Sequence, residues 1–276
     1  MTEASLVRAT FAGVSHLADP CLRGEHGIVV AFSERTGGRS LGDYDSLDLA
    51  AHVGDDPASV DDNRCGLLRS LGIEPLRDRL TTSEQVHGTT VREVVGASIG
   101  LGAYARAGYP PPIPSADALL TLEVDVPLML CYADCVPVVL VAKGPARGVA
   151  VVHAGWRGAL SRLPGKAAER LAAASGCQCS DLTAYIGPHI GPCCYEVDET
   201  LLSQFVNSFG RIAAAQGRLD LGAVVSQSLN EVGVPISSQL HSGLCTAELT
   251  DRFYSYRAEG ATGRHGAVAC ILGTAR

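Results

Sequence analysis

The 276-residue sequence has little charge and few aromatic side chains. Asp, Glu, Lys and Arg make up 18% of the residues, below the roughly 25% of typical soluble domains, whereas 46% are hydrophobic. This composition argues against a long disordered tail, because such tails combine high charge with low hydrophobicity. We expect most of the chain to form packed interior.

Positive charge is scarce and dispersed. The 22 Lys and Arg residues are outnumbered by 29 Asp and Glu, the formal net charge is -7, and no basic cluster is found. Binding to nucleic acid or to an anionic membrane surface relies on such clusters, so both partner classes are excluded. Small molecules are the expected ligands.

The sequence also lacks a signal peptide and a membrane-spanning run. The first twenty residues have no basic start and no continuous apolar core, and the run "VPLMLCYADCVPVVLVA" is interrupted by Asp134 and carries two prolines. These features predict a cytoplasmic protein. Its ten cysteines are then expected to remain reduced, as core side chains, nucleophiles or ligands.

Strand and helix patterns intermix without strict alternation. Short apolar runs predict strands that begin at Gly27, Thr90, Val126, Val136, Arg147, Asp181 and Ala267. Helical patterns are found at residues 56–72, after Pro164, and around Leu201 and Val224. A surface loop is expected at residues 96–117, which contain four prolines near their end. The prediction is an α+β fold: one domain over residues 1–276, with a mixed sheet flanked by helices and a poorly defined segment at 1–26.

Three residues of metal-binding type lie at breaks in apolar segments. His87 follows "TTSEQV", Cys135 lies in "CYADCVPVVL", and His153 ends the strand "GVAVV". Two His and one Cys form a plausible ligand set for catalytic zinc, which keeps a fourth position open for water. The spacing matches no short ligand motif, so three separate packing residues are the alternative.

Eight ordered segments carry a family resemblance. They are "SERTGGRS", "LDLAAHVGDDPASVDDNR", "EQVHGTTV", "SADALLT", "YADCVPVVL", "VVHAGWRG", "IGPHIGPCCYEV" and "FYSYRAEGATGRHGA". From about Gly27 to its end, the chain resembles the laccase-domain family, also called the YfiH or polyphenol-oxidase laccase-like family. The resemblance implies a single α+β domain with one zinc ion per chain, held by His87, Cys135 and His153, which would also be the catalytic residues.

The same resemblance implies purine nucleoside chemistry. Expected reactions are phosphorolysis of adenosine, inosine, guanosine and methylthioadenosine, and deamination of adenosine. Copper-dependent phenol oxidation is rejected, because multicopper oxidases collect many imidazoles, commonly as His-x-His pairs, and this chain has eight His and no such pair. Relatives have also been linked to peptidoglycan quality control.

Substrate contacts are predicted for three further residues. Arg157 stands near the start of a helix, where free N–H groups and a guanidinium favour an anion such as phosphate, and Arg35 lies beside two glycines as a second anion clamp. For each arginine the alternative is a structural or solvated salt bridge. Asp134 either orients a ligand histidine or bound water, or caps a turn. Glu84 and Glu196 are weak candidates for the general acid or base.

Two alternatives use the cysteines differently. In a thiol hydrolase acting on peptidoglycan precursors, Cys135 and His153 would be nucleophile and base, with His87 or Asp134 orienting the histidine. A redox or partner-binding protein would leave the complete ligand set unexplained. A four-cysteine zinc site of Cys177, Cys179, Cys193 and Cys194 is disfavoured, because structural zinc sites leave two or more residues between paired cysteines. The segment "GPHIGPCCYEV" is instead expected to line the pocket, with Tyr195 stacked on a base or packed in the core.

Overall fold

The computed structural model describes residues 5–144 and 146–273, in which the strands form two large sheets. One sheet has five strands, all antiparallel, in the order β1 (Val7–Phe11), β2 (Val14–Ala18), β3 (Ile28–Ser33), β13 (His265–Ile271), β6 (Leu128–Tyr132). The other has six strands in the order β12 (Gln239–His241), β9 (Leu182–Ile186), β7 (Val136–Ala142), β8 (Gly148–Ala154), β5 (Ala118–Thr121), β4 (Val91–Glu93). The outer pairs β12–β9 and β4–β5 are parallel and the rest antiparallel, which makes this sheet mixed.

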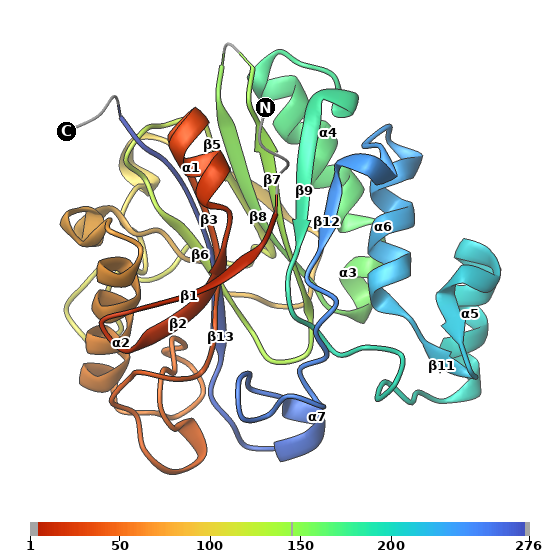
Figure 1. Cartoon of the computed structure of the whole chain (residues 1–276), viewed down its shortest axis with the longest axis horizontal. Helices are drawn as coiled ribbons and strands as arrows, with labels where there is room; N and C mark the ends of the chain where they lie inside the picture. Colours follow the sequence, from red (N-terminus) through yellow and green to blue (C-terminus); the bar gives the residue numbers. More distant parts are fainter. Residues whose placement is uncertain (1–4, 145, 274–276) are drawn as a thin grey trace.

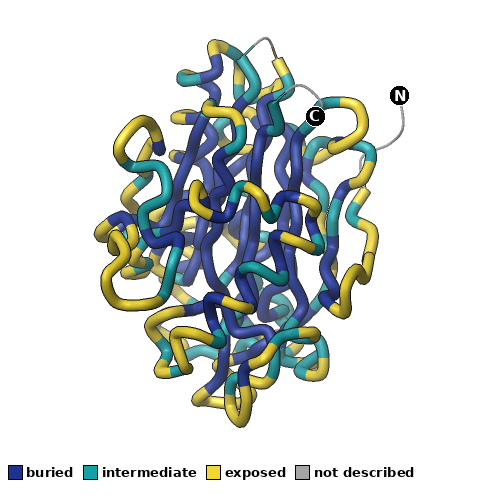
Figure 2. Tube along the Cα trace, turned by 90° about the vertical axis from the view of Figure 1, so that its left-hand side faces the viewer, coloured by how far each residue is buried: buried dark blue, intermediate teal, exposed yellow. Residues whose placement is uncertain are grey.

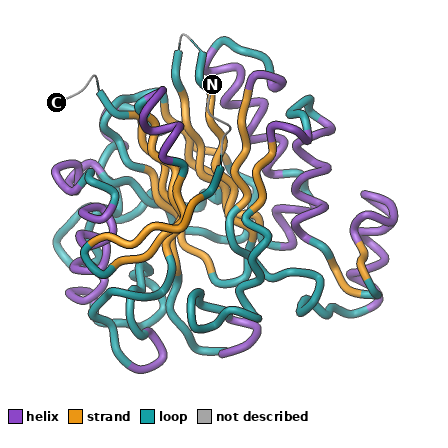
Figure 3. The backbone as a smooth tube through the Cα atoms, in the orientation of Figure 1, coloured by secondary structure: helices purple, strands orange, loops and turns teal. Residues whose placement is uncertain are grey.

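The two sheets pack face to face at the centre of the molecule (Figure 3). Their shared core is made of alternate side chains from both sheets, including Phe32, Leu130, Val139 and Val151. Because side chains alternate along a strand, each sheet has a second apolar face to cover. Strands buried on both faces account for the continuous hydrophobic runs of the sequence, and Figure 2 shows them as a buried centre within exposed loops.

Helices cover the two outer faces (Figure 1). On the six-stranded sheet lie α4 (Leu163–Ser175) and α6 (Leu221–Glu231), with α3 (Trp156–Leu160) and α5 (Glu199–Phe209) beside them. The five-stranded sheet is covered by α2 (Pro57–Ser70), which contributes Leu67 and Leu68 to that core. The remaining helices are α1 (Pro20–His26) and α7 (Tyr256–Glu259), and a small ribbon of β10 (Ala214–Ala215) and β11 (Arg218–Leu219) follows α5. The result is an α+β domain, as predicted.

The helix ends follow the local sequence. Asp56 caps α2 by accepting a bond from the Ser59 N–H, and Pro57 occupies the first turn, where a missing N–H costs nothing. Pro164 likewise lies in the first turn of α4, and Arg162 at positive φ separates this helix from α3. The segment from Trp156 to Ser175 is therefore two helices with a break between them.

Sequence patterns predicted no element before Gly27, where the structure has β1, β2 and α1. The hairpin has no predicted counterpart, because the apolar–polar alternation of "VRATF" in β1 spans only five residues, all of which are exposed. The short strands β5, β10, β11 and β12 also have no predicted counterpart, because their two to four residues do not stand out as separate apolar runs. The seven predicted strands and four predicted helices are all found.

Candidate metal and substrate site

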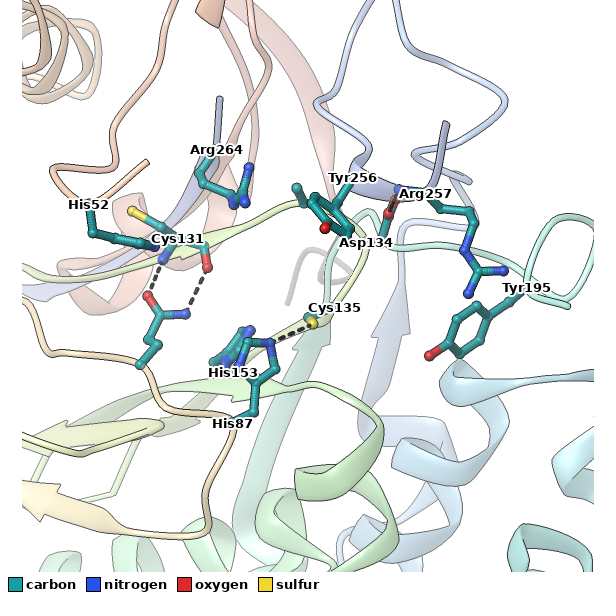
Figure 4. Close-up of a pocket in the computed structure, with 12 residues that line it drawn as sticks. His52, His87, Cys131, Asp134, Cys135, His153, Tyr195, Tyr256, Arg257 and Arg264 are labelled. Atoms are coloured by element: carbon teal, nitrogen blue, oxygen red, sulfur yellow. Dashed lines mark hydrogen bonds between the residues drawn. The ribbon is translucent and has the colours of Figure 1, made fainter. Parts of the chain in front are cut away.

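The three predicted ligand residues come together where β7 and β8 meet the loop before β4. His153 is near the end of β8, Cys135 directly precedes β7, and His87 reaches over from the 85–90 loop (Figure 4). Their ligand atoms all lie within 4.8 Å of one another, and Cys135 Sγ is 3.8 Å from His87 Nε2. This group can hold a metal ion.

Asp117 is the residue that positions both histidines. It is fully buried next to β5 and accepts a 2.8 Å hydrogen bond from His153 Nδ1. The same carboxylate accepts backbone N–H bonds from Val86, His87 and Gly88, at 3.2, 2.9 and 2.7 Å. A proton held on Nδ1 leaves Nε2 of His153 free for a metal, which is the usual role of a carboxylate behind a ligand histidine.

The loop that carries His87 is held in an unusual conformation. His87 has a φ of +56°, in the left-handed region that non-glycine residues rarely adopt. Beside it, the Gln85 side chain makes two hydrogen bonds with the Cys131 backbone on β6, at 2.7 and 2.9 Å. These bonds and those to Asp117 hold the imidazole over Cys135.

Gly155 leaves room for the ligands. Its φ of -70° needs no glycine, but a Cβ at this position would be 2.9 Å from His87 Cδ2 and 3.1 Å from Cys135 Sγ. The glycine is therefore required by the close approach of two side chains and not by a sharp turn.

Cys135 and His153 perturb each other electrostatically. Burial raises the pKa of the Cys135 thiol, but the positive charge and hydrogen bond of His153, with a hydrogen bond from His87, outweigh it and lower the pKa to about 6. Burial lowers the pKa of His153, but the Cys135 charge and the hydrogen bond to Asp117 raise it. The surroundings thus favour the thiolate form of Cys135, which is the form that binds a metal ion, and a bound cation would take the place of a proton on His153.

Two hollows open beside the three ligands. The larger, of about 300 Å³, is lined by the three candidate ligands, by Tyr195 and, in the upper part of Figure 4, by Tyr256, Arg257 and Arg264. The smaller, of about 160 Å³, is lined by His87, Cys135, Tyr195, Trp156 and Arg157, among others. The larger volume is at the lower end of the range usual for small-molecule sites.

The predicted substrate residues differ in where they lie. Arg157 lines the smaller hollow, with its guanidinium 4.3 Å from the Trp156 ring and no carboxylate paired with it among the described residues. Arg35 lines neither hollow: it donates to Glu259 and to the carbonyls of Asp45 and Thr250, the structural alternative named from the sequence.

Asp134 lies at the junction of the two hollows. Its carboxylate accepts hydrogen bonds from the Thr246 hydroxyl at 2.7 Å and the Arg257 N–H at 2.6 Å, and its φ is +84°. The Asp134 side chain thus connects two loops. It makes no hydrogen bond with His87 or His153, whereas Asp117 bonds to both residues. Glu84 and Glu196 do not line the hollows, and Glu84 Oε2 accepts from the Ser115 N–H.

Sequence reasoning missed Asp117, Arg257 and Arg264, although all three lie in the quoted motifs. Asp117 had a detectable signal, since it is a lone carboxylate before the apolar run "ALLT" and needs a buried partner. The two arginines belong to "FYSYRAEGATGRHGA", more than 100 residues from the ligands. Only the packing of α7 and the start of β13 brings them to the site.

The family model described as multi-copper polyphenol oxidoreductase laccase matches residues 29–272. The chain belongs to this family. A purine nucleoside phosphorylase YlmD of Geobacillus stearothermophilus is 37% identical over 248 residues, covering 86% of this chain and 88% of that protein. A purine nucleoside phosphorylase of Streptomyces coelicolor is 36% identical over 244 residues, covering 87% and 93%.

Solved structures of the family share this fold. YlmD of Geobacillus stearothermophilus superposes with a TM-score of 0.84 at 31% identity, covering 98% of this chain and all of that one. The Bacillus licheniformis protein YfiH also has a TM-score of 0.84, at 28% identity. Within residues 5–144 and 146–273, every helix is too short or too polar to traverse a bilayer.

Proposed function

We propose that this chain is a zinc-dependent purine nucleoside phosphorylase. The observation that carries the proposal is the convergence of His87, Cys135 and His153 at the junction of two hollows flanked by arginines. Two relatives that the chain matches over 88% and 93% of their length are named purine nucleoside phosphorylases. The substrates we propose are adenosine, inosine, guanosine and methylthioadenosine, each with phosphate.

The donor set supports zinc as the ion. Two imidazole nitrogens and one thiolate are typical ligands of catalytic zinc, which leaves one position open. The orienting carboxylate of Asp117, the depressed pKa of Cys135 and the missing Cβ at Gly155 all favour a cation here. Multinuclear copper chemistry would need many more imidazoles around the same point. When bound, zinc supplies a Lewis acid that stabilises developing negative charge.

The two hollows divide the substrates. We place the nucleoside in the larger one, where the half-buried Tyr195 and the exposed Tyr256 offer faces to the purine. Phosphate binds in the smaller one against Arg157, whose guanidinium has no carboxylate paired with it in the described part of the chain. A phosphate oxygen forms a bond to the ribose anomeric carbon as the bond from that carbon to the purine nitrogen breaks. The hydrogen of hydrogen phosphate ends on the purine, which yields free base and ribose 1-phosphate.

Adenosine deamination is the second activity we assign to the same site. It replaces the exocyclic amine by an oxygen from water and needs no phosphate, so the larger hollow suffices for it. Arg157 therefore takes part in phosphorolysis and not in deamination.

A product assay tests the proposal. Each of the four nucleosides is incubated with purified protein, with and without phosphate, and the products are separated by chromatography. Phosphate-dependent release of free base and ribose 1-phosphate (5-methylthioribose 1-phosphate from methylthioadenosine), abolished by a chelator and restored by Zn²⁺, is expected. Release that ignores the chelator, or no release with any of the four, would contradict the zinc-dependent phosphorylase.

One observation favours a second candidate, a thiol hydrolase acting on peptidoglycan precursors. Cys135, His153 and Asp117 form a chain of thiolate, imidazole and carboxylate, the order found in cysteine hydrolases. In such an enzyme His87 would only help to lower the pKa of Cys135, whereas it is essential to a three-ligand metal site. His87→Ala therefore separates the two: activity would persist in a hydrolase and disappear, with the metal, in the metalloenzyme.

A further inference from the structure

A second group of ligand atoms lies outside the site described above. The thiols of Cys193, Cys194 and Cys245 come within 4.8 Å of one another. The first two follow β9, in the turn before α5, and the third follows β12, which pairs with β9 in parallel. Cys177 and Cys179, the partners weighed from the sequence, do not belong to this group.

Backbone hydrogen bonds hold the two loops together. His189 and Cys245 form a parallel bridge, in which His189 N–H donates to Leu244 and Thr246 N–H donates to His189. In the turn itself, the N–H groups of Cys194 and Tyr195 both donate to the Gly191 carbonyl at 3.0 Å. The three sulfurs therefore lie on two loops that are held together by backbone hydrogen bonds.

Gly191 lets the sulfurs meet. A Cβ there would lie 3.1 Å from Cys193 Sγ and 3.7 Å from Cys245 Sγ. The Gly191 N–H also donates to Cys245 Sγ at 3.3 Å, a bond that stabilises negative charge on sulfur. Cys245 is buried and Cys193 exposed, and both line a hollow of about 450 Å³, through which an ion can enter from solvent.

We propose that Cys193, Cys194 and Cys245 together bind one soft d¹⁰ cation of the cuprous type. Thiolates select such ions over harder ones. Among the described residues no imidazole or carboxylate joins the group, whereas zinc in structural sites takes four ligands. Three thiolates without a fourth donor match Cu(I) better than Zn²⁺. The site binds the ion and requires no oxidation.

The bound ion would brace the walls of the substrate site. Thr246, next to Cys245, donates to Asp134, and the Ile190 N–H donates to the Asp134 carbonyl at 3.0 Å. Asp134 is the neighbour of Cys135, so both cysteine-bearing loops are bonded to the segment that carries the first site. Binding is nevertheless measurable by itself, and the proposal is independent of the phosphorylase function.

Anaerobic titration with Cu(I) tests the site. Zinc-loaded full-length protein competes for Cu(I) with a chromophoric Cu(I) chelator, and zinc release is followed in parallel. One equivalent of Cu(I) per chain, taken up without release of zinc, is expected. Cys193→Ser and Cys194→Ser should weaken uptake by at least roughly 10- to 100-fold, the loss that even an outer-shell change causes at metal sites.

Cys177→Ser is the matched control, because it removes a partly exposed thiol outside the group and should bind Cu(I) as the wild type does. Cys193 is the safest of the three to change, since it is exposed. No uptake, equal uptake by the serine variants, or uptake that displaces zinc from Cys135 would overturn the proposal. So would a disulfide between Cys193 and Cys245 in protein purified anaerobically, or a second zinc equivalent that Cu(I) does not displace.

Discussion

Asp117 and His153 are joined by two hydrogen bonds. The Asp117 carboxylate accepts from His153 Nδ1 at 2.8 Å, and the Asp117 carbonyl accepts from the His153 N–H at 2.7 Å. Because the same carboxylate also accepts the backbone N–H of His87, one buried side chain determines the position of both ligand histidines.

Asp117→Asn should therefore weaken metal binding while the ligands themselves are intact. An amide has one acceptor oxygen in place of two and no charge to stabilise the arrangement, so we expect about a 10- to 100-fold loss of zinc affinity. Competition with a zinc indicator dye measures this. Asp134→Asn is the control, because that carboxylate contacts Thr246 and Arg257. Equal losses in the two variants would show that Asp117 has no special relation to the metal.

Gly155→Ala is expected to disrupt the metal site by steric contact alone. The new Cβ would lie 2.9 Å from His87 and 3.1 Å from Cys135, so at least one ligand must move away. We expect zinc affinity to fall by about tenfold or more, a loss typical of displaced ligand geometry. Gly158→Ala is the control, because Gly158 belongs to the same motif and a Cβ there would be 3.4 Å from the nearest atom, an ordinary contact. This variant should bind zinc normally. Full zinc content in Gly155→Ala would contradict this account.

The convergence of the three candidate ligands was predictable, because each lies at a break in an apolar segment and belongs to a motif that the family shares. His87, Cys135 and His153 are of this kind, and so are the strands and helices with clear periodicity. Asp117 was harder to assign, because its role depends on two loops that meet only in three dimensions. Arg35 is a different case: an arginine beside two glycines has the pattern of an anion clamp, but its Nε and Nη1 atoms donate to Glu259 and two carbonyls, contacts that only the folded chain brings together.

Arg157 and Arg35 can be distinguished by their dependence on phosphate. Arg157→Lys keeps the charge but loses the two-pronged contact, so phosphate saturation should require several-fold more phosphate, while zinc content and adenosine deamination change little. Steady-state phosphorolysis at varied phosphate measures this. Arg35→Lys should leave phosphate saturation unchanged. It should lower the unfolding temperature, because the Arg35 side chain links the backbone at Asp45 to residues 250 and 259. Weaker phosphate saturation in Arg35→Lys together with normal saturation in Arg157→Lys would show that Arg35, and not Arg157, contacts the phosphate.

His265 is expected to make folding sensitive to acid. It is fully buried beside the rings of Tyr132 and Phe253, and burial, with the charge of Arg264, lowers its pKa from 6.5 to about 3. Between these values the unfolded chain binds a proton that the folded chain does not, so the free energy of unfolding falls as the pH falls through this window. His265→Phe should flatten that dependence, measured by urea unfolding from pH 7 to pH 4.

Asp48 is expected to change the free energy of unfolding with pH in the direction opposite to His265. Burial raises its pKa from 3.8 to about 6, so the folded state holds an extra proton between these values and the contribution of Asp48 to stability declines as the pH rises through them. Asp48→Asn keeps an acceptor for the Ala50 and Arg264 N–H groups and should gain stability relative to the wild type as the pH rises from 4 to 7. His265→Phe should instead gain relative to the wild type as the pH falls. Parallel profiles for both variants and the wild type would show that neither buried group governs the acid response.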